Sequence, residues 1–393
     1  IRDSVNPHSH LFHRALRGGA HGEDFWNWRT TMYQVAERLD PDRYHELALG
    51  VFGEMLDAGY TSVGEFHYLH HRPDGSRYPH HEMELAVAEA ARQAGIRLTL
   101  LDTCYLHGGF GQPLEAGQKR FGDGSVEAWV QRWHELADAL PADPRVRLGA
   151  ALHSVRAVAL DELHHAIAGL PADVPVHVHV SEQPAENRAC QEATGLTPTT
   201  VLERAGVLSA RTTVVHATHL SDEDLAMIAH TGTTVSLCPT TEADLADGIP
   251  RTADLVAAGV PLAIGSDENV VTDPFAELRM IESGVRLSSG RRGVVSNERL
   301  WGSGAQVHSV LPELAAVDPQ RPGLRVGDPA DMVAISPDSA RLAGVDPLRW
   351  PLTASEADVT ATIVAGQRVP SHSPATLRSA LHTPVSYTHL RAH

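Results

Sequence analysis

Apolar, β-branched runs alternate with amphipathic helical stretches from residue 4 to residue 287, and this alternation constrains the fold more than any other feature. The runs are short, and parallel strands that are buried on both faces are typically continuous apolar runs of this kind. Candidate strands occupy residues 4–8, 61–65, 97–104, 146–153, 176–180, 213–216, 233–237 and 262–267. Eight strands that alternate with helices predict an α/β fold, namely a (β/α)8 barrel of the TIM type.

The segments between these strands carry helix signals. Asp40 and Pro41 are typical of a helix start, and Leu47, Val51 and Met55 follow at helical spacing. Further helices are expected at residues 82–94, 126–140, 157–167, 185–205, 222–231 and 274–287. Each of them follows a candidate strand, as a barrel of this kind requires.

Polar motifs stand at the ends of four candidate strands. The first strand runs into His8-Ser-His10, the fifth contains His179, the sixth ends at His216 and the eighth ends at Asp267. Two histidines two residues apart on a strand point to the same face, and active residues of such barrels lie at the carboxyl ends of strands. Alone, a strand histidine is usually a satisfied polar residue and Gly-Ser-Asp is an ordinary turn. Together they predict a hydrolytic zinc site, because zinc binds imidazole and carboxylate ligands and keeps one position open for water.

Charge and composition exclude several classes of partner. The formal net charge is −17 with a pI near 5.8, and no basic patch or stripe appears, so we expect neither nucleic acid nor an anionic membrane as a partner. There is no run of eighteen apolar residues and no visible signal peptide. The three cysteines are odd in number and far apart, which is typical of reduced thiols. We therefore expect a cytoplasmic protein.

The pattern changes beyond residue 320. Segments 323–335 and 358–369 carry strand and turn signals without helices between them, which predicts a small β-layer separate from the barrel. We therefore expect a barrel domain at residues 1–319, a β-segment at 320–372 and a tail at 373–393. Residues 384–393 fit neither pattern, and we expect them to be disordered or foreign to the native gene.

Four longer stretches carry a resemblance to a known family. They are residues 8–18, 25–33, 58–71 and 237–249, and they include Trp-Asn-Trp-Arg at 26–29 and Glu-Phe-His-Tyr-Leu-His-His at 65–71. With the metal motifs, they resemble the amidohydrolase superfamily in its mononuclear deaminase branch, and more narrowly the formimidoylglutamate deiminases (N-formimino-L-glutamate iminohydrolases) of histidine degradation. The metal motifs are general to the superfamily, whereas these two stretches are much more selective.

The resemblance implies a ligand set and a catalytic set. It implies that one zinc ion per chain is bound by His8, His10, His179 and Asp267. It also implies that Glu182 passes a proton to the substrate nitrogen, with His216 beside the reacting centre and Asp267 taking a proton from water. Related binuclear enzymes bridge two metals with a lysine on the fourth strand. The only lysine here, Lys119, lies in a Gly-rich stretch off that strand, which favours one metal ion.

The resemblance also implies a substrate, a small amidine with two carboxylates. Arginine binds carboxylates in bidentate fashion, and Arg29 and Arg156 match the family positions for this role. Tyr68, His153 and His13 are expected to add hydrogen bonds, although His13 stands where the family can have Gln. We place Arg29 in a long loop after the first strand and Arg156 just after the fourth strand.

The expected activity is zinc-dependent hydrolysis of N-formimidoyl-L-glutamate to N-formyl-L-glutamate and ammonia, and a homodimer is compatible with it. One alternative is another deaminase of this branch that acts on a cyclic amidine such as a purine, pyrimidine or pterin. Such a site needs aromatic side chains that stack on the ring and amide groups that hydrogen-bond to it. A second alternative is an inactive, truncated barrel that only binds metal or ligand. The family begins with short strands that complete a β-sandwich, and this chain starts at the first barrel strand, so we expect the sandwich to be incomplete.

Overall fold

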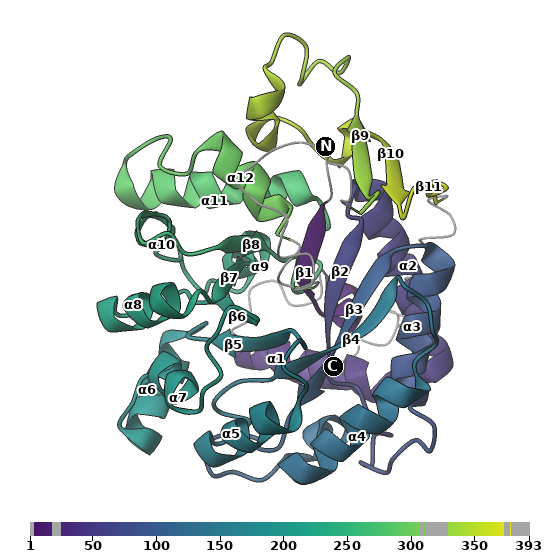
Figure 1. The fold of residues 1–393 in the computed structure, drawn as a ribbon, viewed down its shortest axis with the longest axis vertical. Helices are drawn as coiled ribbons and strands as arrows, with labels where there is room; N and C mark the ends of the chain where they lie inside the picture. The colour runs from purple at the N-terminus through teal and green to yellow at the C-terminus, as the bar shows by residue number, and fades with distance from the viewer. Residues whose placement is uncertain (1–3, 18–24, 307–309, 311–328, 373–377, 379–393) are drawn as a thin grey trace.

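The barrel is present and nearly closed in the computed structural model, which describes residues 4–17, 25–306, 310, 329–372 and 378 (Figure 1). One sheet holds eight parallel strands in the order of the chain. They are β1 (Val5–Ser9), β2 (Ser62–His67), β3 (Arg97–Cys104), β4 (Val146–Leu152), β5 (Val176–Val180), β6 (Thr212–His216), β7 (Thr234–Leu237) and β8 (Leu262–Ile264). A parallel bridge between Ser9 and Asp267 joins the end of β1 to the residues after β8. The predicted fold class is confirmed.

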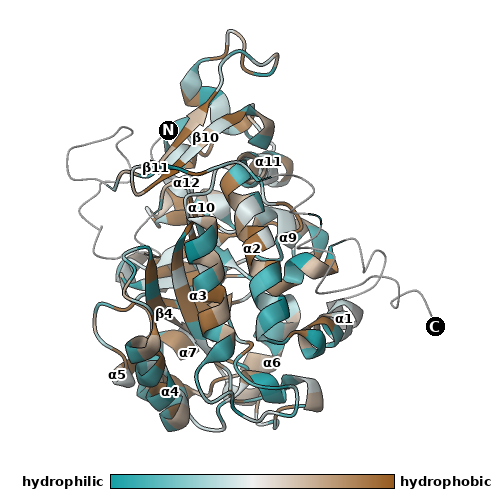
Figure 2. Ribbon diagram, turned by 90° about the vertical axis from the view of Figure 1, so that its right-hand side faces the viewer, coloured by the Kyte–Doolittle hydropathy of each residue, from teal (hydrophilic) through white to brown (hydrophobic). Residues whose placement is uncertain are grey.

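The helices form the outer layer of the barrel (Figure 2), and in that view the strands carry hydrophobic residues while the helices show hydrophilic residues as well. They are α1 (Phe25–Arg38), α2 (Pro41–Ala58), α3 (Glu82–Ala94), α4 (Val126–Ala139), α5 (Leu160–Gly169), α6 (Pro184–Thr194), α7 (Pro198–Arg204), α8 (Asp222–Thr231), α9 (Pro239–Asp244), α10 (Thr252–Ala257), α11 (Pro274–Ser289) and α12 (Asn297–Gly304). The 3-10 helices η1 (Leu11–Leu16) and η2 (Ala116–Phe121) lie in loops after strands. Helix α2 begins as expected, because the Asp40 side chain accepts a hydrogen bond from the Arg43 backbone N–H at 2.9 Å.

Two expectations about the helices are wrong. The single helix expected at 185–205 is split into α6 and α7, because Gly195 adopts a left-handed φ of 73° and ends α6, and Thr197 and Pro198 start α7. Arg29 lies in α1 and not in a loop. The first error comes from capping residues that divide a longer helical pattern.

A small antiparallel sheet packs against the barrel, as expected for a β-layer after it. It consists of β9 (Met332–Ile335), β10 (Val359–Val364) and β11 (Gln367–Arg368), in the order β11-β10-β9. Thr362 donates a hydrogen bond to the carbonyl oxygen of Leu56 at 2.6 Å, and Asp331 pairs with Arg97 at 2.9 Å. Because Arg97 begins β3 and Leu56 lies near the end of α2, the sheet lies at the amino-terminal side of this part of the barrel, away from the carboxyl ends of the strands.

Some expectations lie outside the described residues. The boundary between residues 319 and 320 and most of the tail at 373–393 are among them. The division into domains and the incomplete sandwich therefore stay predictions. Among the described helices, none is long and apolar enough to cross a membrane.

Candidate active site

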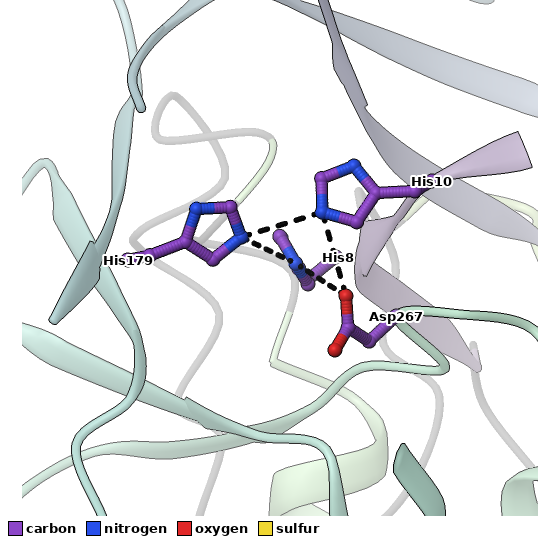
Figure 3. A group of neighbouring side chains, drawn as sticks. All are labelled: His8, His10, His179 and Asp267. Atoms are coloured by element: carbon purple, nitrogen blue, oxygen red, sulfur yellow. Dashed lines mark hydrogen bonds and ion pairs between the residues drawn. The ribbon is translucent and has the colours of Figure 1, made fainter. Parts of the chain in front are cut away.

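Four of the predicted side chains meet at the carboxyl ends of the barrel strands (Figure 3). The Nε2 atoms of His10 and His179 lie 3.3 Å apart, and those of His179 and His8 lie 3.2 Å apart. Oδ1 of Asp267 lies 3.1 Å from Nε2 of His8 and 3.4 Å from Nε2 of His10. All four residues are buried, and they come from the end of β1, from β5 and from the loop after β8.

The hydrogen bonds behind two of the rings settle which nitrogens face the centre. Nδ1 of His10 donates to the carbonyl oxygen of Phe66 at 3.0 Å, and Nδ1 of His179 donates to the carbonyl oxygen of His153 at 2.9 Å. A carbonyl oxygen can only accept, so each neutral ring turns an unprotonated Nε2 toward the other. Two such lone pairs at 3.3 Å repel each other unless a cation lies between them. The four side chains therefore fit a divalent metal ion, with the backbone carbonyls orienting the rings.

The loop after β8 is held in an unusual backbone conformation. Asp267 has φ 45° and Asn269 has φ 56°, which is the left-handed region. Nδ2 of Asn269 donates to Oγ of Ser9 at 3.1 Å and to the carbonyl oxygen of His10 at 3.0 Å. Non-glycine residues in this region cost of order 1–3 kcal/mol and persist where surrounding contacts over-determine them. Here those contacts aim Asp267 at the histidines.

The two other predicted catalytic residues lie beside this centre. Nε2 of His216 is 3.8 Å from Oε1 of Glu182 and 3.7 Å from Oδ2 of Asp267, and its Nδ1 is 3.6 Å from Oε1 of Glu242. Burial raises the pKa of Glu182, with the charge of His216 acting against it. Burial alone would lower the pKa of His216, but the facing carboxylates outweigh it and raise that pKa well above its usual value. Glu182 and His216 can therefore both carry a proton beside the reacting centre, where a leaving group would need one.

The predicted substrate residues line the same pocket as the catalytic ones. The structure brings all five of them to its wall: His13, Arg29, Tyr68, His153 and Arg156. Nε2 of His13 and the hydroxyl of Tyr68 share a hydrogen bond of 3.0 Å, and Nε of Arg29 donates to the hydroxyl of Tyr33 at 2.5 Å. Nε of Arg156 is buried and has no hydrogen-bond partner within the described part of the chain. A guanidinium in that state is suited to an anionic ligand.

Sequence reasoning did not single out several further residues of this wall. They are Trp28, Met32, Tyr33, Tyr105, Phe121, Leu245 and Glu268. Tyr105 follows the end of β3 and Glu268 follows Asp267. Both could have been predicted from the sequence, because each lies just after the carboxyl end of a candidate strand. His219 has a structural contact behind the site, because its Nε2 is hydrogen-bonded to the carbonyl oxygen of Asp247 at 2.8 Å.

The fold and the site define a metal-dependent hydrolase built on a (β/α)8 barrel. The sequence model described as "Amidohydrolase family" matches residues 4–316, and the chain belongs to that family. It is 37% identical over 377 residues to the formimidoylglutamate deiminase of Pseudomonas aeruginosa, a match that covers 93% of this chain and 83% of the relative. It is 28% identical over 275 residues to the 8-oxoguanine deaminase of the same organism, covering 68% of this chain and 59% of that relative.

Solved structures agree with this family. An amidohydrolase from Brucella melitensis has a TM-score of 0.87 at 33% identity, covering 98% of this chain and 89% of that chain. An adenosine deaminase from Xanthomonas campestris with bound zinc has a TM-score of 0.81 at 20% identity, covering 98% and 84%, which shows the shared fold. The predicted class of enzyme, a hydrolase that acts on C–N bonds, is confirmed.

Proposed function

We propose that the protein hydrolyses N-formimidoyl-L-glutamate to N-formyl-L-glutamate and ammonia. One observation carries the proposal: Arg29 and Arg156 line the same pocket as Glu182, His216 and Asp267. The pocket therefore combines two cations for a dianion with acid/base groups for a C–N bond. The relative of 37% identity is a formimidoylglutamate deiminase, which supports the same substrate.

We further propose one zinc ion per chain, bound by His8, His10, His179 and Asp267. Their converging nitrogen and oxygen atoms support it, and a structural neighbour of the same fold carries zinc. When bound, the metal would lower the pKa of a water molecule to about 7 and so supply a nucleophile at neutral pH.

The side chains of the chain account for the proton transfers. As the water oxygen bonds to the imidoyl carbon, Oδ2 of Asp267 accepts the water proton. His216, whose pKa the facing carboxylates raise, donates a hydrogen bond to the oxygen on which negative charge develops. Glu182, whose pKa burial raises, gives its proton to the substrate nitrogen. The substrate enters as an amidinium with two hydrogens on this nitrogen, so the proton from Glu182 is the third. The hydroxyl proton of the tetrahedral intermediate then returns to Glu182 as the carbonyl forms and the C–N bond breaks, and the nitrogen leaves as ammonia.

The remaining pocket residues hold the substrate. We assign one carboxylate to Arg29 and the other to Arg156, since a charge-assisted bidentate pair fixes both position and orientation. His13, Tyr68 and His153 add hydrogen bonds from the wall between them. The substrate is thus a small dianionic amidine.

A second candidate is deamination of a cyclic amidine such as a purine. Trp28, Tyr105 and Phe121 line the pocket and could stack on a ring, and an 8-oxoguanine deaminase is among the relatives. Ammonia release from formimidoylglutamate, guanine, cytosine and adenosine separates the two candidates. We expect turnover of formimidoylglutamate at least about a hundredfold faster, because two carboxylate pairs of roughly 1.5–3 kcal/mol each favour it. A preference for any of the uncharged rings would overturn the proposal.

We also propose the division into a barrel at 1–319 and a β-segment at 320–372, a cytoplasmic location and a homodimer. The three cysteines are buried and unpaired, which supports a reducing compartment. Sedimentation of the purified protein tests the homodimer, since a monomer at micromolar concentration would contradict it.

A further inference from the structure

One acidic side chain of the pocket has no part in the chemistry above. Glu268 lines the pocket together with Glu182 and Arg156, and it is only 3% exposed. Its Oε2 atom is buried and accepts no hydrogen bond from the residues that the structure describes. A buried carboxylate oxygen without a donor is costly, so such a group is usually matched by a ligand or an ion.

The backbone around Glu268 is fixed, so its side chain has little freedom to leave the pocket. Its N–H donates to Oγ1 of Thr241 at 3.2 Å, and the N–H of the next residue, Asn269, donates to the carbonyl oxygen of Ser266 at 2.8 Å. It stands between two residues in the left-handed conformation, Asp267 and Asn269. Such a turn is set by its surroundings and holds the carboxylate in place.

Several carboxyl groups lie near Glu268. The groups that act on it most strongly are the side chains of Asp267, Asp244, Glu182 and Asp247. Asp247 itself has a ligand atom within 4.8 Å of atoms of Glu182 and His216. This wall of the pocket follows β5, β7 and β8. It is therefore suited to a cation.

Neither arginine is among the strongest influences on Glu268. The positive charges of Arg29 and Arg156 both act on Tyr105 and His153, which follow β3 and β4, and Arg156 also acts on Glu182. In a closed eight-stranded barrel, β3 and β4 lie across from β7 and β8. Both arginines thus act on the side of the pocket that follows β3 and β4, and Arg156 also reaches Glu182, whereas the groups that act most strongly on Glu268 are all carboxyl groups.

We propose that Glu268 binds the cationic amidinium group of the substrate and selects a charged amidine over a neutral isostere. This inference rests on the proposed function, because it names the partner for the acidic wall. An amidine is a strong base that is protonated at neutral pH. Oε2 of Glu268 would accept an N–H of that cation while the carboxylates are bound by Arg29 and Arg156. A charge-assisted pair in a desolvated pocket then distinguishes a cation from a neutral group of the same shape.

A pair of isosteres tests this without turnover. N-amidino-L-glutamate carries a guanidinium, and N-carbamoyl-L-glutamate carries a neutral urea of the same shape. Calorimetry on metal-loaded protein should show that Glu268→Gln weakens binding of the guanidinium compound by about tenfold or more, as expected for loss of a charge-assisted pair. Binding of the urea compound should change by less than about twofold. Glu268→Asp, which keeps the charge, should retain part of the preference.

A matched control distinguishes a direct contact between Glu268 and the ligand from a long-range effect of negative charge. Asp244 is exposed and also acts on Glu268 through its charge, so Asp244→Asn should change neither affinity by more than about twofold. Equal loss for both ligands in Glu268→Gln, or loss of bound metal by elemental analysis, would show that Glu268 supports the metal ligands and would overturn the inference.

The outcome also distinguishes this inference from the proposed function. If the wild type releases ammonia from formimidoylglutamate but Glu268→Gln keeps the full preference for the guanidinium compound, only the inference fails. If the wild type neither turns over formimidoylglutamate nor binds either isostere, both fail.

Discussion

Ser9 and Asp267 form the parallel bridge that joins the two ends of the barrel sheet, and three of the four proposed metal ligands lie at or beside this bridge. The N–H of His10 donates to the carbonyl oxygen of Asp267 at 2.8 Å, and the N–H of Asp267 donates to the carbonyl oxygen of His8 at 3.0 Å. Closing the barrel and assembling three of the four ligands are therefore the same event. Metal binding should stabilise the closed barrel directly.

Removing the metal should lower the thermal stability of the protein. A ligand that binds only the folded state stabilises it by about 2.7 kcal/mol at a hundred times its Kd. We expect a chelator to lower the melting temperature and zinc to restore it, as measured by calorimetry. Asp267→Asn, which weakens the site, should show a smaller response, and a melting temperature that is indifferent to metal would contradict the link to barrel closure.

The metal content should be one equivalent per chain. His8, His10, His179 and Asp267 form one complete group of nitrogen and oxygen ligands, and Lys119 lies in η2, away from the fourth strand. Elemental analysis of metal-replete protein measures the ratio. Two tightly bound equivalents would require a binuclear site.

Glu182→Gln should abolish turnover and retain the metal. The amide keeps the shape but loses the proton, and a positioned acid/base group typically contributes about 10²–10⁴-fold to the rate. Steady-state kinetics and metal analysis on the same sample measure both effects. Near-normal activity would assign the proton transfer to another residue, whereas loss of metal would make Glu182 a ligand.

Arg29→Met and Arg156→Met should each reduce kcat/KM for formimidoylglutamate by at least about tenfold. Each change removes a charge-assisted pair of roughly 1.5–3 kcal/mol, and ~1.4 kcal/mol corresponds to a factor of ten. Arg291 is exposed, and Arg291→Met serves as the control that should change little.

Substrate analogues decide whether these arginines bind carboxylates. The loss caused by each change should largely vanish with an analogue that lacks the corresponding carboxylate. Equal damage on substrate and analogue would show that Arg29 and Arg156 have a structural role instead.

Arg132→Met should destabilise the fold without touching the pocket. Arg132 is buried and pairs with Asp102 at 2.7 Å, Asp123 at 2.9 Å and Glu84 at 3.2 Å. Breaking a buried pair by removing one partner costs about 3–5 kcal/mol. Denaturant unfolding at pH 7 measures the loss. Arg92→Met breaks an exposed pair with Glu89 and should have little effect.

The cost of Arg132→Met should shrink at low pH. Burial would raise the pKa of Asp123, but Arg132 and the neighbouring histidines hold it well below its usual value. A depressed carboxylate pKa contributes stability above the unfolded pKa, and that contribution is lost as pH falls toward the folded pKa. Unfolding free energies of wild type and variant should therefore converge between about pH 5 and pH 2. A constant difference over that range would contradict this source of stability.

Local patterns in the sequence predicted the strands, most helices and the motifs whose side chains lie together at the carboxyl ends of the strands. Strand and helix periodicity depends on neighbouring residues, so α3 and α8 have the expected bounds. His8 and His10 were recognisable because two side chains at spacing two share a face of a strand. The split between α6 and α7 was missed because it depends on a single glycine at a helix end.

Only the tertiary structure decided which residues far apart in the chain share a wall of the pocket. Three such groupings join segments from different barrel units: the Ser9–Asp267 bridge, the carboxyl groups around Glu268, and Arg132 with Glu84 and Asp102. Local sequence preferences do not predict such contacts, because the contacts form only when the strands pair and the barrel closes. Single motifs in the sequence therefore indicated the chemistry of the site, whereas the arrangement of charged side chains around the pocket arises only in the folded barrel.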